Sequence, residues 1–274
     1  MRIGISTFIT DQGIRPAPLG IALEERAFDS LFIAEHSHIP VRRESPYPGG
    51  GELPEWYCRT LDPFVALSVI AAVTRRLLLG TGVALVPQRD PIHTAKEVAS
   101  LDLVSDGRAV FGIGVGWNRE EMRNHGADPA TRGLVADERL RAIRELWTAD
   151  EAEFHGRFVD FDPVFAWPKP VQCPHPPIYV GGGRRAFHRV AELGDAWLAN
   201  SDAPDDLGPR MEHLREVAGR DVPVTVYGVR GGAEQLEGYR RLGVERVLLD
   251  LPTMPESESL EHLDELAALA DGFR

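Results

Sequence analysis

Cysteine is scarce in this chain, and long apolar runs are missing. Cys58 and Cys173 are the only cysteines in 274 residues, which excludes a disulfide framework, and neither stands in a zinc-binding spacing with another cysteine. No window approaches the roughly 18 consecutive apolar residues of a membrane span, and the segment after Met1 has no apolar signal-peptide core. We therefore expect a cytoplasmic protein that does not enter a membrane.

Positive charge is also in short supply. The chain has 30 Lys and Arg residues against 42 Asp and Glu residues, which gives a net charge of −12. A nucleic-acid-binding protein needs a surplus of basic side chains to displace counterions from phosphates, so we expect no nucleic-acid partner. Hydrophobic residues at 43% and charged residues at 26% are typical of globular proteins and argue against a disordered chain.

What the chain does contain is a regular alternation of short apolar runs with longer segments of helical period, which is typical of βαβ units. The expected strands span residues 3–7, 31–34, 77–81, 109–113, 178–180, 196–199, 223–227 and 246–250. The expected helices span residues 19–28, 62–74, 92–104, 134–147, 185–193, 205–218, 233–241 and 258–270. Eight such units predict a (β/α)8 TIM barrel, with residues 1–274 as a single domain.

An open, doubly wound sheet is the alternative fold, because local patterns do not distinguish open from closed parallel sheets. The first strand-to-helix turn, Ser6 to Ile14, lacks the G-x-G-x-x-G pattern of dinucleotide-binding versions of that fold. Two stretches rich in Pro or Gly, residues 40–56 and 150–177, predict long irregular loops after strands two and four. We expect these loops to shape a substrate pocket.

Polar or glycine-rich segments follow four of the expected strands. They are Glu35-His36-Ser37-His38, Gly80-Thr81-Gly82-Val83, Gly112 to Asn118, and Gly181-Gly182-Gly183-Arg184. In a parallel barrel the carboxyl ends of the strands meet at one face, which is where catalytic groups sit. Glycines let the backbone approach a flat ring, and a glycine-rich helix start can hold a phosphate through its N–H groups. These segments predict a cofactor cleft, with added positive charge from Arg184.

Glu35, His36 and His38 are compatible with two kinds of chemistry. Together with Asp250, at the end of the eighth strand, they are candidate metal ligands of a hydrolase. Against that interpretation, the fourth strand has no lysine for a bridging carbamate, and the fifth and sixth strands do not end in histidine. The favoured interpretation has no metal, and His36 beside Glu35 transfers a proton or polarises a reacting centre, because histidine titrates near neutral pH.

Six segments stand in an order that is typical of one family. They are Phe32 to His36, Leu77 to Val83, Gly112 to Glu121, Arg139 to Trp147, Ile178 to Gly183 and Gly194 to Trp197. Together they resemble the luciferase-like monooxygenase superfamily, and in particular its deazaflavin F420-dependent oxidoreductases. The resemblance covers nearly the whole chain. It implies a (β/α)8 barrel, a homodimer, and hydride transfer between F420 and a small organic substrate.

The resemblance also implies roles for individual residues. The cofactor ring would lie in the barrel mouth against a non-prolyl cis peptide at Gly82-Val83. Glu35 and His36 would touch the ring, with His36 as the acid or base. Asn118 and the glycines Gly181 to Gly183 would hold the cofactor side chain and its phosphate.

This chain departs from the sugar-phosphate dehydrogenases of the group. They carry a Trp shortly after the histidine, where this chain has Ile39-Pro40-Val41, and the insertion with their phosphate-binding lysines is missing. Glucose 6-phosphate is therefore not an expected substrate. Trp56, Tyr57 and Trp117 are candidates for an aromatic wall of the pocket.

Three other functions stay open at this point. One keeps the fold but uses reduced FMN, delivered by a separate reductase, to activate O₂ for monooxygenation. A second is the metal-dependent hydrolase. A third is a carrier that binds a flavin or deazaflavin without turning it over.

Overall fold

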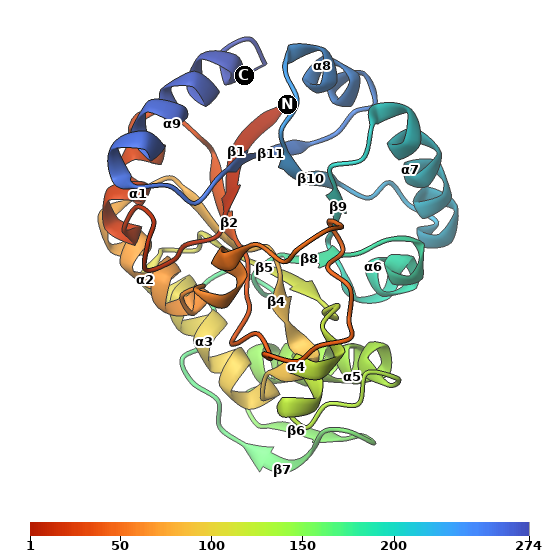
Figure 1. Ribbon diagram of the computed structural model, residues 1–274. Helices are drawn as coiled ribbons and strands as arrows, with labels where there is room; N and C mark the ends of the chain where they lie inside the picture. The colour runs from red at the N-terminus through yellow and green to blue at the C-terminus, as the bar shows by residue number, and fades with distance from the viewer. Residues whose placement is uncertain (274) are drawn as a thin grey trace.

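Eight parallel strands form a closed barrel at the centre of the computed structural model, which describes residues 1–273 (Figure 1). They are β1 (Arg2–Thr7), β2 (Ser30–Ile33), β3 (Leu78–Thr81), β5 (Ala109–Gly114), β8 (Ile178–Gly181), β9 (Ala196–Asn200), β10 (Val224–Val229) and β11 (Arg246–Leu251). Each strand pairs in parallel with two neighbours, and the β3–β5 pairing, with Leu79 opposite Ala109, closes the ring. The predicted TIM barrel is confirmed, and the open doubly wound sheet is wrong.

After each barrel strand a helix packs on the outside of the barrel (Figure 1). These helices are α1 (Pro16–Glu25), α2 (Pro63–Val73), α3 (Pro91–Val104), α5 (Arg132–Thr148), α6 (Phe187–Leu193), α7 (Pro204–Ala218), α8 (Ala233–Arg241) and α9 (Glu256–Ala270). Local sequence sets several starts: Asp62 and Asp90 cap α2 and α3 by accepting from Val65 N and His93 N, and a proline follows each cap. Within residues 1–273, no helix combines the length and the apolar character needed to cross a membrane.

The irregular loop expected at residues 150–177 is partly wrong, because it contains an antiparallel hairpin of β6 (Ala152–His155) and β7 (Asp160–Val164). The strands were not predicted because six prolines in this stretch, one of them within β7, argue against regular structure. β7 tolerates Pro163 because a two-stranded hairpin leaves one edge of each strand unpaired.

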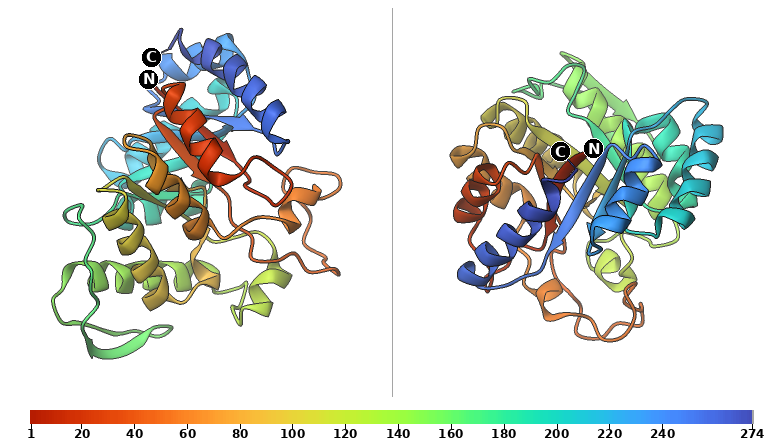
Figure 2. Two further views of the ribbon diagram at one scale, coloured as in Figure 1. Left: turned by 90° about the vertical axis from the view of Figure 1, so that its left-hand side faces the viewer. Right: turned by 90° about the horizontal axis from the view of Figure 1, so that it is seen from above.

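The short elements lie mostly at the barrel mouth. They are β4 (Ala84–Leu85), the helix α4 (Arg119–Asn124), and the single 3₁₀ turns η1 (Glu55–Cys58), η2 (Val86–Gln88) and η3 (Arg184–Ala186). The periodicity of the sequence predicts none of them, because each is too short to show a repeat. The segment between β2 and α2, which carries η1, projects from one end of the barrel (Figure 2).

Inside the barrel, aromatic and aliphatic side chains pack in layers. Phe32 and Tyr179 stack with ring centroids 5.9 Å apart, beside Leu198 and Leu248. Below them Arg246 is fully buried and donates to Asp29 (2.9 Å) and to the Tyr179 hydroxyl (3.0 Å). A buried guanidinium needs such partners, because desolvation alone strongly disfavours a charge.

Arg246→Ala is therefore expected to lower the free energy of unfolding by about 3 kcal/mol or more, since it leaves Asp29 without its cationic partner and opens a cavity in the barrel. Chemical denaturation measures this loss. Arg2, the register partner of Arg246 on β1, is the control: its ion pair with Glu245 is exposed, and Arg2→Ala should change stability by less than about 1 kcal/mol. Similar losses in the two variants would contradict the proposed importance of the buried pair.

Candidate functional site

A cavity of about 370 Å³ lies at the carboxyl ends of the barrel strands. Its lining includes His36 after β2, Val83 after β3, Gly114 on β5, Gly181 on β8 and Tyr227 on β10. The segment after β2 contributes further wall through Pro48 and Tyr57. This volume lies within the range of small-molecule and cofactor sites.

Val83 forms one wall of this cavity. The Gly82–Val83 peptide is cis, as the family resemblance implies. A Cβ atom on Gly114 or on Gly181 would lie within 2.5 Å or 2.9 Å of the Val83 side chain. The two neighbouring strands therefore need glycine at these positions so that Val83 fits between them.

Five of the residues predicted to hold a cofactor lie outside this lining: Gly80, Thr81, Asn118, Gly183 and Arg184. Gly80 and Thr81 are buried in β3, where Thr81 Oγ1 donates to the Gly112 carbonyl at 2.6 Å. Gly183 and Arg184 are exposed beyond the rim. The strand ends thus bring Glu35, His36, Gly82, Val83, Gly181 and Gly182 together around one space.

His36 is held by Glu121, a residue to which the sequence analysis gives no role. The His36 Nδ1 atom lies 2.8 Å from Glu121 Oε2, and the Glu121 side chain is fully buried. The backbone N–H of Ser37 donates to the other carboxylate oxygen at 3.2 Å. The carbonyl of His36 accepts from Thr60 Oγ1 at 2.7 Å, so the residue is fixed at both its ring and its backbone.

Asn118 acts on this pair through the helix that carries Glu121. Its side chain caps α4 by accepting from Glu121 N at 3.2 Å, and its Nδ2 atom is buried with no hydrogen-bond partner among the described residues. An Asn followed three positions later by Glu is a sequence signature of a helix start. That signature is the signal that predicts α4, but it does not reveal that the carboxylate faces a histidine.

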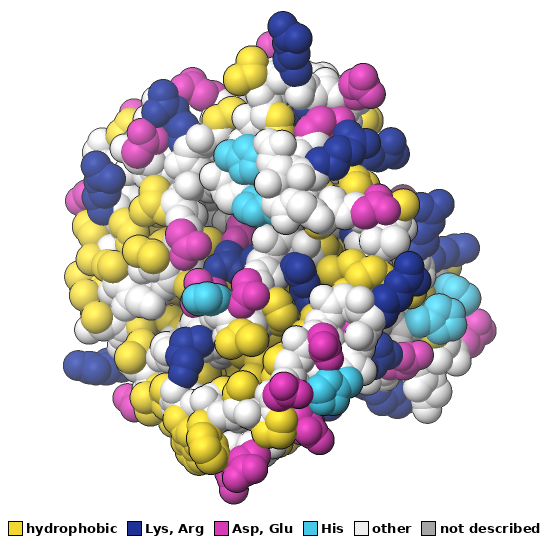
Figure 3. Space-filling view, turned by 90° about the horizontal axis from the view of Figure 1, so that it is seen from below, with side chains coloured by type: hydrophobic (Ala, Val, Ile, Leu, Met, Phe, Trp, Pro, Cys, Tyr) yellow, Lys and Arg dark blue, Asp and Glu magenta, His cyan; other side chains and the backbone are white. Residues whose placement is uncertain are grey.

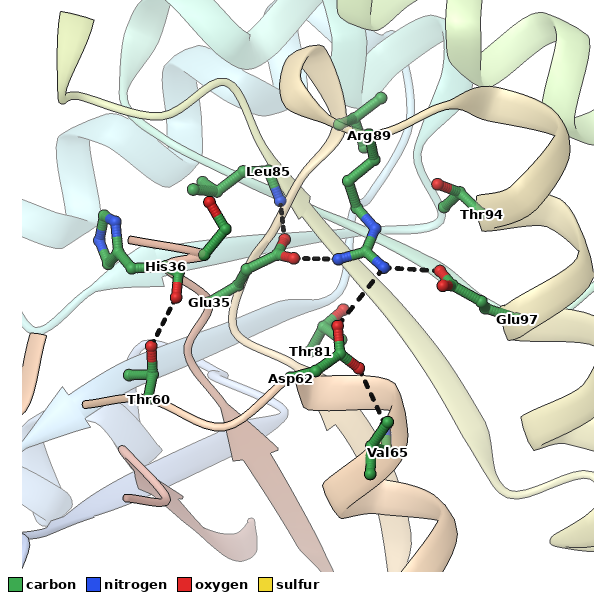
Figure 4. Close-up of polar contacts among 12 residues, drawn as sticks. Glu35, His36, Thr60, Asp62, Val65, Thr81, Leu85, Arg89, Thr94 and Glu97 are labelled. Carbon is green, nitrogen blue, oxygen red and sulfur yellow. Dashed lines mark hydrogen bonds and ion pairs between the residues drawn. The ribbon is translucent and has the colours of Figure 1, made fainter. Parts of the chain in front are cut away.

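Glu35 points away from His36 and bonds to the segment that follows β3 (Figure 4). One carboxylate oxygen accepts from Leu85 N at 2.6 Å, and the other accepts from the Arg89 guanidinium. Arg89 also contacts Glu97 at 2.6 Å and Asp62 at 3.8 Å. Burial raises the pKa of Glu35, although Arg89 and the Leu85 N–H oppose the rise.

Aromatic side chains surround the free edge of His36. The ring centroids of Tyr57 and Trp117 lie 5.1 Å and 5.7 Å from that of His36, and both side chains line the cavity. Trp56, the third aromatic candidate, lines a neighbouring space instead. Because Glu121 occupies Nδ1, Nε2 is the nitrogen of His36 that is left for a ligand, which suits it to exchange a proton with a bound molecule.

The four candidate metal ligands are not brought together. Glu35 is bonded to Arg89, His36 to Glu121, His38 to Ser37 and Asn124, and Asp250 to Arg230. In the part of the chain that the structure describes, no three His, Cys, Asp or Glu side chains are arranged to hold a metal ion. The hydrolase hypothesis therefore gains no support from the geometry of these residues.

A second, larger compartment of about 610 Å³ adjoins the first at the barrel mouth. The two share Phe8, Tyr57 and Tyr227 among their lining residues. These aromatic side chains, of which Tyr57 also contacts the His36 ring, therefore form the boundary between the two compartments.

Comparison with known proteins extends this description. The family described as luciferase-like monooxygenase matches residues 19–230. The uncharacterized protein Rv0953c of Mycobacterium tuberculosis is 39% identical over 277 residues, covering 98% of both chains. An FMNH(2)-dependent dimethylsulfone monooxygenase of Pseudomonas putida is 30% identical over 143 residues, covering 51% of this chain and 39% of that protein.

Among solved structures, an F420-dependent secondary alcohol dehydrogenase in complex with an F420-acetone adduct superposes with a TM-score of 0.76. The match covers 100% of both chains at 17% identity. At that identity the likeness supports the barrel fold alone.

The ion pair of Glu35 with Arg89 leads to a pH-dependent prediction. Arg89→Met leaves a buried carboxylate without its cation, so we expect a loss of about 3 kcal/mol in unfolding free energy at neutral pH. A carboxyl group whose folded pKa lies above its unfolded value costs stability once it ionises. The loss should therefore shrink as pH falls through the folded pKa of Glu35 and grow as pH rises.

Urea titrations of Arg89→Met and the parent protein at several pH values measure this effect. Arg141→Met is the matched control, because the Arg141–Glu192 pair is exposed and should contribute less than about 1 kcal/mol at any pH. A loss in Arg89→Met that is constant with pH would show that Glu35 is not the group left unpaired.

Proposed function

The chain belongs to the luciferase-like monooxygenase family, and from that premise we propose that it transfers a hydride between F420 and a small organic substrate. The observation that carries the proposal is the juxtaposition of His36, held by buried Glu121, with a cavity that glycines and Val83 shape at the strand ends. A flat ring against Val83 would leave room for a substrate beside the histidine.

The residues of the mouth fit a deazaflavin or flavin ring. The cavity has apolar walls at Val83, Leu85 and Leu198, and backbone rather than side chain at Gly114 and Gly181. Such walls suit a planar ring whose polar edge is met by backbone groups. When bound, the cofactor supplies the hydride chemistry, and the protein supplies orientation and a proton.

We assign the proton transfer to His36. Its Nε2 atom would exchange a proton with the substrate oxygen or nitrogen, while the Glu121 carboxylate keeps the ring oriented. Glu35 is bonded at both oxygens, so we propose that it positions the backbone around Leu85 and does not itself transfer a proton.

The cofactor phosphate is proposed to lie at Gly181 to Gly183, where η3 begins. Trp197 Nε1 donates to the Gly182 carbonyl at 2.7 Å, which holds this turn in place. Arg184 is exposed at the rim and adds positive charge, and the guanidinium of Arg210, which is paired with Asp202, lies 3.6 Å from the Cβ position of Gly183. Positive charge beside backbone N–H groups favours an anionic group.

The alternative is monooxygenation with reduced FMN delivered by a separate reductase. The dimethylsulfone monooxygenase relative, whose name includes FMNH(2), supports it, and the same cavity would accept either ring. Two measurements distinguish these functions. The first function uses F420, whereas the second uses reduced FMN and consumes O₂.

Titration of the apoprotein with F420 and with FMN, each oxidised and reduced, tests the proposal. Micromolar or tighter binding of F420 with weak binding of FMN is the expected result. A preference for reduced FMN, together with O₂ consumption, would favour the monooxygenase. Binding of neither would contradict both functions.

His36→Gln should lower turnover by roughly 100-fold or more, because a positioned acid or base contributes at least that much, while cofactor binding changes by only a few-fold. Steady-state kinetics and a cofactor titration measure the two effects. His155→Gln is the control, since His155 is exposed on β6 and its ring pairs with Asp160. Unchanged turnover in His36→Gln would remove this residue from the mechanism.

We also propose that the protein is a homodimer. Val65, Val69 and Val73 follow one another at helical spacing on the outer face of α2 and are exposed, as is Ile21 on α1. Figure 3 shows hydrophobic side chains gathered on the left side of the molecule, the side on which α1 and α2 lie in Figure 1. An exposed apolar stripe of this kind is typical of a protein–protein contact.

Val69→Arg should shift the protein from dimer to monomer, because it introduces an unpaired charge into the apolar contact. Analytical ultracentrifugation at micromolar concentration measures the change. Leu134→Arg, at an exposed position on α5, should leave the dimer intact. A Val69→Arg dimer as stable as the parent would exclude the α2 face as the contact.

A further inference from the structure

The second compartment of the barrel mouth carries a charged pair that the proposed reaction does not use. Asp250, a residue of β11 and a candidate metal ligand from the sequence, accepts from Arg230 Nε at 2.8 Å. The Asp250 side chain is 16% exposed and that of Arg230 is 77% exposed. Both residues line the compartment.

The walls around this pair are mostly aromatic. Phe8, Tyr47, Trp56, Tyr57 and Tyr227 all line the compartment. The Tyr57 ring lies 4.6 Å from that of Phe8 and 5.3 Å from that of Tyr47, so these side chains form one continuous wall. A wall of this kind favours a ligand with a flat or cyclic apolar body.

Each ionisable group on the lining of the two compartments that carries a carboxylate, guanidinium or imidazole has a partner inside the protein. Glu35 contacts Arg89, His36 contacts Glu121, and Asp250 contacts Arg230. A charged ligand entering this space would lose hydration without meeting an unpaired opposite charge, which disfavours its binding. An uncharged ligand has no such cost.

The pair still offers directional hydrogen bonds. Asp250 accepts from the Nε atom of Arg230. The two terminal nitrogens of this guanidinium have no hydrogen-bond partner among residues 1–273. Asp250 in turn has lone pairs beyond the one that accepts from Arg230. Donors and acceptors therefore stand side by side at one end of an otherwise aromatic space.

We propose that this second compartment binds the substrate, that the substrate is an uncharged molecule with an aromatic or alicyclic body, and that the Arg230–Asp250 pair recognises a hydroxyl, carbonyl or carboxamide group at its far end. The near end lies beside Tyr57, whose ring is 5.1 Å from that of His36, and so next to the cofactor cavity. This inference rests on the proposed function for the reaction, but the binding preference belongs to the protein without cofactor.

The test uses three probes of one shape and different charge: benzyl alcohol, benzoate and benzylammonium. Binding to the apoprotein is followed by quenching of tryptophan fluorescence, since Trp56 lines the compartment, and by calorimetry. In the parent protein we expect benzyl alcohol to bind most tightly. Arg230→Gln leaves Asp250 unbalanced and should shift the preference toward benzylammonium by about five- to tenfold, and Asp250→Asn should shift it by a similar factor toward benzoate.

The double variant Arg230→Gln/Asp250→Asn should favour neither charged probe and should bind benzyl alcohol more weakly than the parent does. The control is the exposed pair Arg215–Asp221 on and beside α7, whose variants Arg215→Gln and Asp221→Asn should leave all three affinities unchanged. Circular dichroism and the urea midpoint of each variant verify that it is folded.

Several results would overturn the inference. They are tighter binding of benzoate or benzylammonium than of benzyl alcohol to the parent protein, shifts of the same sign in the two single variants, or no saturable binding of any probe. A loss of F420 affinity in Arg230→Gln with unchanged probe binding would assign this pair to the cofactor instead. Failure of the proposed function itself appears separately, as absence of F420 and FMN binding to a protein that still selects among the probes.

Discussion

The carboxylate of Glu35 has to be satisfied inside the barrel mouth, and much of the site depends on how this is done. One oxygen accepts from the Leu85 backbone and the other from Arg89, so the end of β2 is tied to the chain that follows β3. That chain includes Val83, the wall of the cavity. An unpaired carboxylate at this depth would be costly, so these bonds hold the two segments together.

The same constraint orients the next residue. With Glu35 directed toward Arg89, the His36 ring lies against α4, where Glu121 meets its Nδ1 atom. One strand end thus supplies an anchor and a reactive group in adjacent positions, and the two side chains take their partners from different elements. A mouth built in this way has fixed polar groups that are paired with one another, which agrees with hydride transfer to or from an uncharged molecule.

The fold could be predicted from the sequence because eight repeats of one short pattern leave few arrangements, and each barrel strand is mostly buried and so contains a short apolar run. His36 and the Gly82–Val83 peptide could be located because they follow such strands or match the family. Glu121 and Arg89 could not. Glu121 is 85 positions from His36 in the chain, and Arg89 is 54 positions from Glu35. A local sequence pattern does not indicate which distant side chains will form such a pair.

The short elements could not be predicted from the sequence for a different reason. α4 has six residues and gives less than two turns of periodicity, and the prolines around β7 conceal a hairpin whose edges are open. The sequence also does not predict which of the glycines near the strand ends face the cavity. Gly114 and Gly181 make room for Val83, whereas Gly80 is buried in β3 against Phe32 and does not face the cavity.

The most direct test of the account is a crystal structure of the protein with F420 bound. We expect the ring to lie in the cavity against Val83, with His36 Nε2 facing the space beside the reactive ring carbon and the second compartment open to a substrate. A ring bound outside the strand ends, or one that fills the second compartment and turns away from His36, would contradict it.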